Sequence, residues 1–246
     1  MGEMRKCEDE RFARSEALLG SEAMARLKAA RVLVVGVGGV GSWCVEALVR
    51  TGLGHITLID DDVVAESNVN RQCPATAATV GRAKVEAMAE RLKAINPGCE
   101  VEVRNSRFSS AASISSWASF DLIVDAIDSV DCKAELILGA TEAGIPLVSS
   151  MGAALRFDPT KVKVTRFEKV EGDGLARALR QRFKKLGRFP KGKFSCVWSG
   201  EVPVIAPRSE GAAGTVSKGS LMQVTAVFGM CLASEAVKIL TKGEMK

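Results

Sequence analysis

A glycine-rich turn is the first part of this sequence whose residue types could bind a ligand. Residues 36–42 read Gly-Val-Gly-Gly-Val-Gly-Ser, after the apolar run 31–36 and before a helical pattern over 43–50. Glycines allow a tight turn that approaches phosphate closely, and the N–H groups at a helix N-terminus bind anions. Asp60, at the end of the next apolar run, is placed to hold ribose hydroxyls. This order of strand, turn and helix favours a nucleotide site over a turn without a ligand.

Cations and a further carboxylate follow the strand ends and favour a triphosphate over a nicotinamide dinucleotide. Arg71 and Lys84 come after the second apolar run, and Asp128 comes after the run 121–126. The two cations would stabilise charge that develops at an α-phosphorus, and Asp128 could hold Mg²⁺ against the phosphates. Solvated surface charges and a helix N-cap are the alternatives, and the joint placement argues against them. The expected nucleotide-binding residues are Gly36, Gly38, Gly39, Gly41, Asp60, Asp62, Asn68, Arg71, Gln72, Lys84 and Asp128.

The elements that must position these residues alternate between strand and helix. Short valine-rich runs are typical of strands buried on both faces, and the periodic segments between them predict helices. The predicted strands are 31–36, 55–60, 99–104, 121–126 and 146–149, and the predicted helices between them are 43–50, 82–95 and 132–143. Repeated strand–helix–strand units predict an α/β fold with a doubly wound, mostly parallel, Rossmann-like sheet.

The pattern changes after residue 152 and predicts antiparallel strands that extend this sheet. Residues 153–157 and 162–167 flank Asp158-Pro159-Thr160 and predict a hairpin. A basic helix (175–186), a strand region (194–205), a Gly/Ser-rich loop (209–220) and a final helix to about Leu240 should follow. Because no long linker interrupts the chain, we expect one domain over 1–246. Its parts would be N-terminal helices (1–30), a nucleotide-binding half (31–150) and a substrate-side half (151–246).

The composition describes a globular chain with a full core. Of 246 residues, 47% are hydrophobic and 26% are charged, and the net charge is 34 − 29 = +5. These values exclude a disordered chain, a fibrous repeat and a disulfide miniprotein. The longest uncharged run, 219–234, has 16 residues. It is shorter than the ~18 residues that would span a bilayer, and so it predicts a buried helix.

Cysteine and histidine usage bears on zinc and on cellular location. The seven cysteines form no C-x-x-C pair and there is one histidine, His55, so no zinc site of ordinary spacing is expected. The odd cysteine count and a start without a signal-peptide pattern indicate a reducing, cytoplasmic location. Association with a membrane surface is left open.

A strongly basic segment lies between Gly174 and Gly200. Its eight cations are Arg177, Arg180, Arg182, Lys184, Lys185, Arg188, Lys191 and Lys193, and it holds no acidic residue. The rest of the chain therefore carries +5 − 8 = −3. Four aromatic residues are interleaved with the cations: Phe183, Phe189, Phe194 and Trp198. Cations for phosphates with aromatics for unstacked bases predict contact with RNA, and a solvated helix face over core aromatics is the alternative.

The motifs together resemble the E1-like (ThiF/MoeB/HesA) adenylating enzymes over roughly residues 10–240. The resemblance rests on the glycine turn, Asp60-x-Asp62, the run Ser67-Asn68-x-x-Arg71-Gln72, Gly81-x-x-Lys84 and Asp128. It implies that the glycines wrap phosphate and that Asp60 holds ribose. It also implies that Asn68, Arg71 and Lys84 grip the triphosphate of ATP and that Asp128 positions Mg²⁺. The run Arg11-Phe12-x-Arg14 looks like the N-terminal arginine motif of the family, which implies a homodimer with Arg14 acting on the partner's nucleotide.

Several local runs are similar to one branch of this family, which dehydrates N6-threonylcarbamoyladenosine in tRNA. They include Val40-Gly41-Ser42-Trp43 and Lys193-x-x-Cys196-Val197-x-Ser199, and the paired C-x-x-C motifs usual in sulfur-carrier activators are absent. The resemblance implies that the threonyl carboxylate attacks the α-phosphorus of ATP. The ureido group then closes a ring on the acyl-adenylate and expels AMP. No protein nucleophile is required, because the attacking group is already tethered to the substrate. The branch also implies a cysteine desulfurase or sulfur-acceptor partner.

Cys196 and two competing functions stay open at this point. A cysteine forms a thioester in some relatives, and the basic segment could favour a Cys196 thiolate; an ordinary, partly buried cysteine is the preferred alternative. Activation of a sulfur-carrier or ubiquitin-like protein would use the same nucleotide site. A non-catalytic or NAD-binding Rossmann module would need only the glycine turn and Asp60.

Overall fold

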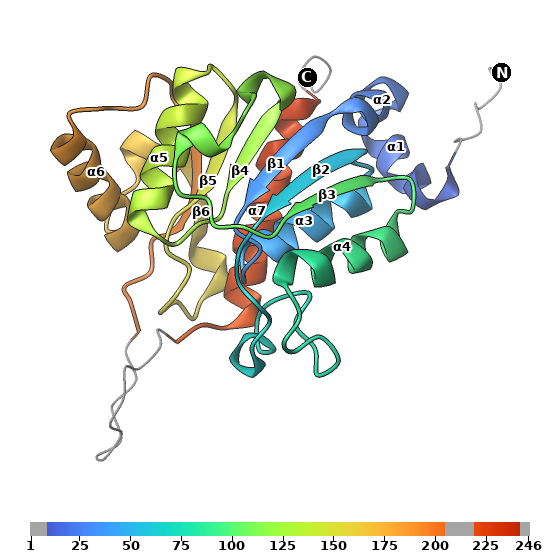
Figure 1. Cartoon of the computed structure of the whole chain (residues 1–246), viewed down its shortest axis with the longest axis horizontal. Helices are drawn as coiled ribbons and strands as arrows, with labels where there is room; N and C mark the ends of the chain where they lie inside the picture. The colour runs from blue at the N-terminus through green and yellow to red at the C-terminus, as the bar shows by residue number, and fades with distance from the viewer. Residues whose placement is uncertain (1–8, 205–218, 242–246) are drawn as a thin grey trace.

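The protein, described by a computed structural model, folds around a mostly parallel sheet with helices on both faces (Figure 1). The structure describes residues 9–204 and 219–241. The strands are β1 (Arg31–Val35), β2 (His55–Ile59), β3 (Glu100–Arg104), β4 (Leu122–Asp125), β5 (Leu147–Ser150), β6 (Val162–Arg166) and β7 (Ser195–Ser199). The α-helices are α1 (Ala13–Leu19), α2 (Ser21–Ala29), α3 (Gly41–Thr51), α4 (Lys84–Ile95), α5 (Val130–Glu142), α6 (Gly174–Leu186) and α7 (Met222–Leu240). The predicted doubly wound α/β fold is confirmed.

The strand order fixes where a ligand can bind. The order within the sheet is β3-β2-β1-β4-β5-β7-β6, and every neighbouring pair is parallel except β6 with β7. The chain moves outward from β1 to β3 on one side, and then returns to the other side of β1 with β4. The point between β1 and β4 is a topological switch point, where open α/β sheets hold their ligands at the carboxyl ends of the strands.

Successive residues of the central strands face two separate cores, which explains their continuous apolar sequence. Val32 and Val34 of β1 belong to a core with α3, α4 and α7. Leu33 and Val35 of the same strand belong to a second core with α5 and α6. The edge strand β3 is largely exposed and charged.

Helix α7 shares its length and composition with membrane-spanning helices, but one face of it packs into the core while Met222 and Met230 are exposed. It is the one helix among residues 9–204 and 219–241 that is long and apolar enough to cross a bilayer. Its residues Val224, Phe228 and Leu232 are fully buried in the first core. The helix lies against α3 and also contacts β4, β5, β6 and β7. The predicted buried helix over this run agrees with this packing.

The predicted hairpin of 153–157 with 162–167 is wrong. Strand β6 does form, but its antiparallel partner is β7, with Val164 opposite Val197. Residues 153–157 form no strand, because Leu155 has a left-handed φ of 61°. The Leu155 N–H donates to Gly219 and its carbonyl accepts from Val204, so both backbone groups are used outside the sheet. The predicted Gly/Ser-rich loop lies almost wholly outside the described residues.

Candidate nucleotide-binding site

A cleft of about 470 Å³ lies at the carboxyl ends of β1, β2 and β4. This volume is in the range of small-ligand sites. Its walls are formed by Val35, Gly36, Gly38, Ile59, Asp60, Asp61, Asp62, Asn68, Arg71, Gln72, Lys84, Arg107, Phe108, Ala126, Ile127, Asp128, Ser129 and Cys132. All the predicted nucleotide-binding residues therefore meet in one cleft except Gly39 and Gly41.

Some glycines of the turn lie too close to neighbouring backbone atoms for a side chain, and one faces the open cleft. Gly36 has a φ of 95°, and a Cβ atom there would lie 2.6 Å from the Ala126 carbonyl oxygen. A Cβ atom at Gly41 would lie 1.9 Å from the Gly36 carbonyl oxygen. Gly41 therefore lets α3 begin against the turn, whereas a Cβ atom at Gly38 would meet no atom within 4 Å. A Cβ atom at Gly39 would lie 3.3 Å from the Arg71 side chain and 3.4 Å from Thr225, so the glycine allows close packing there. The phosphate contacts of Gly39 and Gly41 stay a prediction.

Asp60 joins the end of β2 to this turn. Its carboxylate accepts hydrogen bonds from the Val37 N–H at 2.7 Å and from the Asp62 N–H at 2.9 Å. Burial raises the pKa of Asp60, and the two backbone hydrogen bonds act in the opposite direction. A carboxylate has more acceptor sites than these two bonds fill, so Asp60 can still accept from ribose hydroxyls.

The segment between β2 and α4 leaves the sheet and carries five predicted residues to the cleft, namely Asp60, Asp62, Asn68, Arg71 and Gln72. Lys84, the first residue of α4, is buried, and its Nζ atom lies 2.6 Å from the Asp62 carboxylate. The Asn68 side chain accepts from the Ala65 N–H at 3.1 Å and so stabilises the turn beside it. Arg71 donates to the Ser67 carbonyl and to the Asn70 side chain. No ion pair ties Arg71 to a carboxylate among the described residues, so its charge is available to an anion.

Gln72 presents a buried acceptor that has no partner in the described part of the chain. The residue is 6% exposed, it lines the cleft, and its Oε1 atom accepts no hydrogen bond. Buried polar groups are nearly always paired. A ligand that donates a hydrogen bond in the cleft would satisfy this atom, which fits a bound nucleotide.

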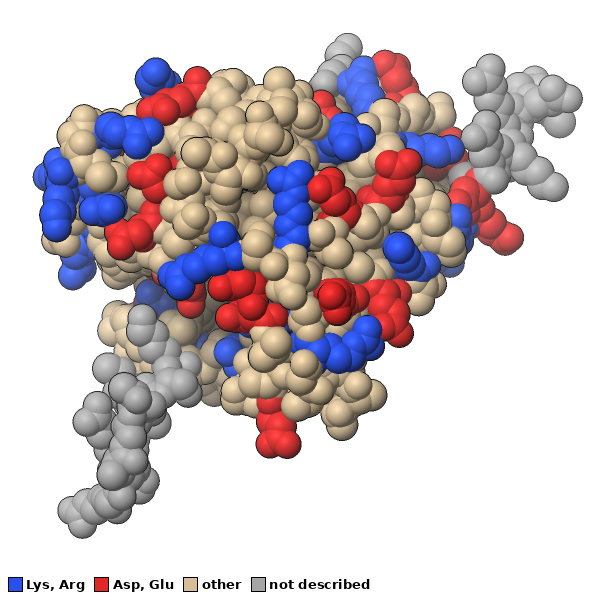
Figure 2. All heavy atoms as spheres, viewed as in Figure 1, with Lys and Arg blue, Asp and Glu red and all other residues tan. Residues whose placement is uncertain are grey.

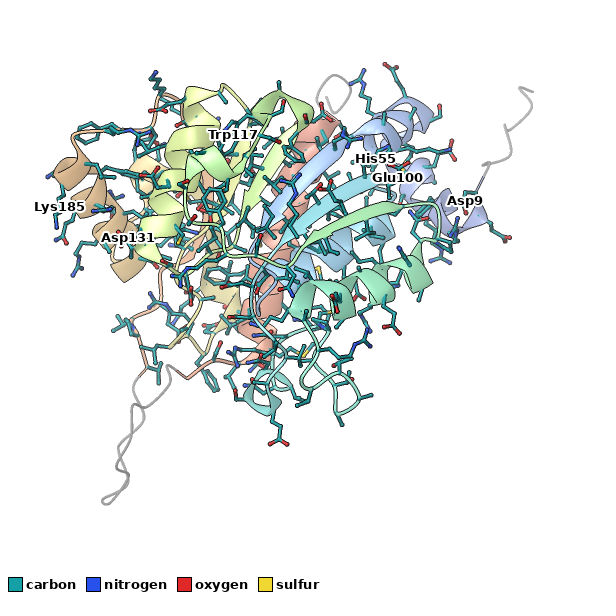
Figure 3. All side chains as sticks on the ribbon, viewed as in Figure 1. Asp9, His55, Glu100, Trp117, Asp131 and Lys185 are labelled. Carbon is teal, nitrogen blue, oxygen red and sulfur yellow. The ribbon has the colours of Figure 1, made fainter. Side chains whose placement is uncertain are left out.

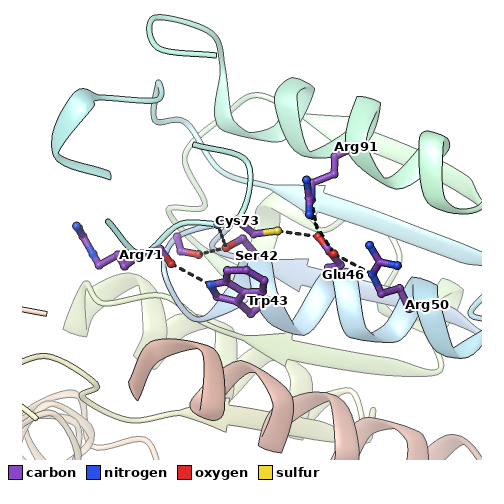
Figure 4. Close-up of polar contacts among 8 residues, drawn as sticks. Ser42, Trp43, Glu46, Arg50, Arg71, Cys73 and Arg91 are labelled. Atoms are coloured by element: carbon purple, nitrogen blue, oxygen red, sulfur yellow. Dashed lines mark hydrogen bonds and ion pairs between the residues drawn. The ribbon is translucent and has the colours of Figure 1, made fainter. Parts of the chain in front are cut away.

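Helix α3 and the segment that carries Arg71 are joined by a polar network (Figure 4). The Trp43 Nε1–H donates to the Arg71 carbonyl, and the Ser42 hydroxyl accepts from the Cys73 N–H. The Cys73 thiol donates to Glu46 at 2.7 Å, and two arginines of α3 and α4, Arg50 and Arg91, also donate to Glu46. The network therefore fixes the backbone on both sides of Gln72 to the helix behind the glycine turn.

The ionisation of this network follows from its contacts. Burial alone would raise the pKa of Glu46, but hydrogen bonds from Arg91, Cys73 and Arg50 lower it to about 2. Burial, together with the neighbouring Glu46, raises the pKa of Cys73 to about 12. Glu46 is therefore a carboxylate and Cys73 a thiol near neutral pH.

Arg107 is a cation of the cleft that the sequence motifs did not identify. It lies in the loop after β3, lines the cleft and is exposed. Contact with Cys132, and in smaller measure the carboxylates of Asp61 and Asp128, raise the pKa of Arg107. The signal that could have found it is topological, because the loop after β3 follows the same carboxyl edge of the sheet as Asp60.

Cys196 lies away from the cleft, so its inclusion among the catalytic candidates is wrong and the preferred interpretation, a packed cysteine, agrees with the structure. It is 0% exposed on β7 and belongs to the core between the sheet, α5 and α6. Burial raises the pKa of the Cys196 thiol far above its ordinary value. Basic residues precede Cys196 in the chain, but in space it packs in an apolar core near the buried charges of Lys133 and Asp125. It is therefore the packed cysteine of the preferred interpretation.

Three of the four aromatic residues of the basic segment are core residues. Phe183, Phe194 and Trp198 are almost fully buried, whereas Phe189 is 59% exposed. The expected stacking surface is therefore reduced to Phe189. The correction has a simple cause, since Phe183 lies on the inner side of α6 and the other two residues precede or belong to the buried strand β7.

The eight cations divide into two groups. Arg180 donates to the carbonyls of Phe167 and Val170, Arg182 pairs with Asp131, and Arg188 lies near Glu135 and Glu142. The other five, which we call the α6 patch, are Arg177, Lys184, Lys185, Lys191 and Lys193. All five are exposed, and none has an ion pair within the described ranges. Lys and Arg gather over α6 at the left of Figure 2, and Lys185 points outward there in Figure 3.

Arg14 lies on α1, at the opposite side of the sheet from α6 (Figure 1). It is exposed and does not line the cleft of its own chain. The position is compatible with contact to a second copy, and the homodimer remains a prediction.

Comparison with known proteins agrees with this fold. The model of the ThiF family matches residues 12–246, and the chain belongs to this family of nucleotide-binding enzymes. It is 40% identical over 250 residues to the tRNA threonylcarbamoyladenosine dehydratase of Escherichia coli K12, covering 93% of this chain and 92% of the relative. It is 36% identical over 247 residues to the Haemophilus influenzae dehydratase of the same name, covering 95% and 94%. The crystal structure of the E. coli dehydratase, TcdA, in complex with ATP superposes with a TM-score of 0.83 at 41% identity, covering 94% of this chain and 93% of that one.

Proposed function

We propose that this chain is an ATP-dependent enzyme that dehydrates N6-threonylcarbamoyladenosine in tRNA. The observation that carries the proposal is the meeting of the glycine turn, Asp60, Lys84 and Asp128 in one cleft. The chain that builds this cleft is similar over nearly its whole length to a dehydratase with ATP bound.

The reaction needs one activation and one ring closure. The threonyl carboxylate oxygen bonds to the α-phosphorus of ATP, the bond between the α-phosphorus and the bridging oxygen breaks, and pyrophosphate leaves. The ureido group of the modified base then bonds to the acyl carbon and loses one N–H proton to solvent. The bond from the acyl carbon to the former carboxylate oxygen breaks, and AMP leaves with that oxygen. One water is lost from the substrate in total. Because the attacking group is tethered to the substrate, the buried Cys196 is not needed as a nucleophile.

Six polar side chains of the cleft would have roles in this reaction. Asp60 would accept from ribose hydroxyls, and Arg71 with Lys84 would stabilise the charge that develops at the α-phosphorus. The Asn68 amide can donate to a phosphate oxygen, and the Gln72 Oε1 atom can accept a hydrogen bond from the nucleotide. Arg107, which faces the same cleft, adds a third cation.

A magnesium ion fits the carboxylates of the cleft. Asp128 is exposed in the wall, and the Asp60, Asp61 and Asp62 oxygens lie within 4.8 Å of one another. Hard carboxylate oxygens beside substrate phosphates are the usual ligands of Mg²⁺. We assign the ion to Asp128, and it would supply positive charge that neutralises the phosphates when bound.

The α6 patch is proposed as the surface that holds the tRNA backbone. Its five exposed cations face solvent without competing carboxylates, so they can neutralise phosphates. A tRNA substrate in turn implies a cytoplasmic protein. The cysteine desulfurase or sulfur-acceptor partner and the homodimer with Arg14 in trans are retained as part of the proposal, as is the single domain over 1–246.

The proposed function is tested by mass spectrometry of tRNA that carries the threonylcarbamoyl group, incubated with the protein, ATP and Mg²⁺. The modified nucleoside should lose the mass of one water, and AMP and pyrophosphate should form in equal amounts. Lys84→Met should lower the rate about a hundredfold, because a donor to the developing charge is removed. The matched control Lys93→Met, on the exposed side of α4, should leave it unchanged. Unchanged tRNA in the presence of bound ATP would contradict the proposal.

A second function uses the same site and a different substrate. Activation of a sulfur-carrier or ubiquitin-like protein would form an acyl-adenylate at the carrier's C-terminus. The sequence lacks the C-x-x-C pairs usual in such activators, which disfavours this alternative. Pyrophosphate exchange that depends on a carrier ending in glycine, and not on tRNA, would support it.

A further inference from the structure

A fully buried ion pair lies directly behind the cleft wall that carries Asp128. The Lys133 Nζ atom, one turn into α5, lies 2.8 Å from the Asp125 carboxylate at the end of β4, and both side chains are 0% exposed. Removing two charges from water costs several kcal/mol each, on the order of what their attraction returns. Such a pair is weak evidence for stability, and its contacts suggest a different purpose.

Both members of the pair bind the same residue, Ile127. The Ile127 N–H donates to Asp125 Oδ1 at 3.2 Å, and the Ile127 carbonyl accepts from Lys133 Nζ at 3.0 Å. The Ser149 hydroxyl of β5 donates to the other Asp125 oxygen at 2.7 Å and so holds that carboxylate in place. The backbone of Ile127 is therefore held on its donor side and on its acceptor side.

This arrangement fixes the position of Asp128. A peptide bond is planar, so the orientation of the Ile127 carbonyl sets the plane that ends at the Cα atom of Asp128. The preceding residue, Ala126, is also held, because its N–H donates to the Val35 carbonyl of β1. Asp128 itself is exposed in the cleft, and its direction depends on this backbone.

We propose that Lys133 is a positioning residue: through the Ile127 carbonyl and Asp125 it orients Asp128 toward the metal of bound Mg-ATP. The inference rests on the proposed function, in which Asp128 holds Mg²⁺. Lys133 does not line the cleft, so it acts through the backbone and not by touching the nucleotide. The same contacts link the cleft to β5, and Cys196 of β7 lies opposite Ser149 in the next strand.

The test compares Lys133→Met with a substitution that only weakens packing. Leu136→Ala, on the same helix, removes a fully buried side chain of the second core and has no polar contact with Ile127. For both full-length variants we would measure unfolding by urea and ATP binding by calorimetry over a range of Mg²⁺ concentrations. Lys133→Met should raise the Mg²⁺ concentration for half-maximal ATP binding about tenfold, as loss of outer-sphere support does at metal sites. Leu136→Ala should lower stability and leave that concentration unchanged.

Two further variants keep the test decisive if Lys133→Met does not fold. Lys133→Arg keeps the charge and the donors, so its Mg²⁺ concentration for half-maximal ATP binding should be close to that of the wild type. Ser149→Ala should raise this Mg²⁺ concentration as Lys133→Met does, but by a smaller factor. Equal Mg²⁺ dependence in all folded variants, or equal shifts for Lys133→Met and Leu136→Ala, would overturn the inference. Because these measurements contain no tRNA, a wild-type protein that binds Mg-ATP but leaves tRNA unchanged would overturn the proposed function alone.

Discussion

At the scale of single residues, Lys84 and Gln72 differ before a nucleotide binds, because one already has a polar partner in the cleft and the other does not. Lys84 already has a carboxylate partner in Asp62, so a phosphate must compete with or add to that pair. The Gln72 Oε1 atom has no described partner, so a ligand donor gains a hydrogen bond there and breaks none. Binding energy should therefore come more readily from Gln72 and Arg71 than from the Lys84 charge.

Arg107 gives a prediction at this scale. Arg107→Ala should raise KM for ATP about tenfold with kcat little changed, because a charge-assisted hydrogen bond worth roughly 1.5 kcal/mol or more is removed from bound substrate and transition state alike. The matched control is Arg104→Ala in β3, whose guanidinium pairs with Glu102 outside the cleft. The kinetics of both variants would be measured at saturating tRNA. Equal effects of the two substitutions would contradict a nucleotide contact by Arg107.

The motif residues could be predicted from sequence because their spacing is tied to strand ends. Asp60 and Asp128 follow buried strands, and parallel strands bring their carboxyl ends to one edge. Lys84 begins α4, at the end of the segment that follows β2. Arg107 belongs to no such motif and was missed. For Cys196 the preferred interpretation, a packed cysteine, is the one that the structure shows, because β7 is buried over Cys196–Ser199.

At the scale of elements, α3 connects the glycine turn to the segment that carries Arg71. The connection runs through the buried carboxylate of Glu46, which accepts from α4, from its own helix and from Cys73. Strand pairing at the other end of the sheet was harder to predict. The sequence between 153 and 167 contains the turn signal of a hairpin, but the partner of β6 is supplied by β7, beyond α6.

The Glu46 network predicts a pH dependence of stability. The pKa of Glu46 falls from an ordinary 4.5 to about 2 in the folded protein. Its ionised form therefore stabilises the fold above the ordinary value, and this contribution is lost as the pH falls toward 2. Glu46→Gln should lower the free energy of unfolding by up to about 3 kcal/mol at pH 7 and by much less near pH 3. Urea unfolding at both pH values would check this.

The exposed Glu90, which pairs with Arg82 on the surface, provides the matched control. Glu90→Gln should change stability by less than about 1 kcal/mol at either pH. If the free energies of unfolding of the wild type and Glu46→Gln differ by the same amount at pH 7 and at pH 3, the network does not depend on the Glu46 charge.

At the scale of the whole molecule, the basic segment presents less unpaired positive charge to solvent than its sequence indicates. Three of its arginines bond within the chain: Arg180 donates to backbone carbonyls, and Arg182 and Arg188 meet carboxylates of α5. The remaining charge is concentrated in the α6 patch, on the far side of the second core from α3 and α4. This separation allows RNA contact and nucleotide contact to be changed independently.

The independence of the two surfaces is a prediction. Lys184→Glu with Lys185→Glu should weaken tRNA binding and leave ATP affinity unchanged, because neither residue lines the cleft. The slope of log affinity against log salt should fall by about 1 for each phosphate that is no longer neutralised. Lys28→Glu with Lys93→Glu makes the same charge change on α2 and α4 and serves as the control. Filter binding of tRNA over a salt series would measure both pairs, and equal weakening by the two pairs would contradict a specific role of α6.

The packing of α7 has a consequence for how the chain reaches its native state during synthesis. The ribosome makes the glycine turn, Asp60 and Lys84 early, but the face of the sheet behind them is covered by α7. Until residues 222–240 have left the exit tunnel, the apolar surfaces of α3 and the central strands lack their final partner. The residues that line the cleft are therefore made by residue 132, but the helix that packs behind them is made only near the end of the chain. A stalled or shortened chain would expose those surfaces to chaperones and proteases before it could bind a nucleotide.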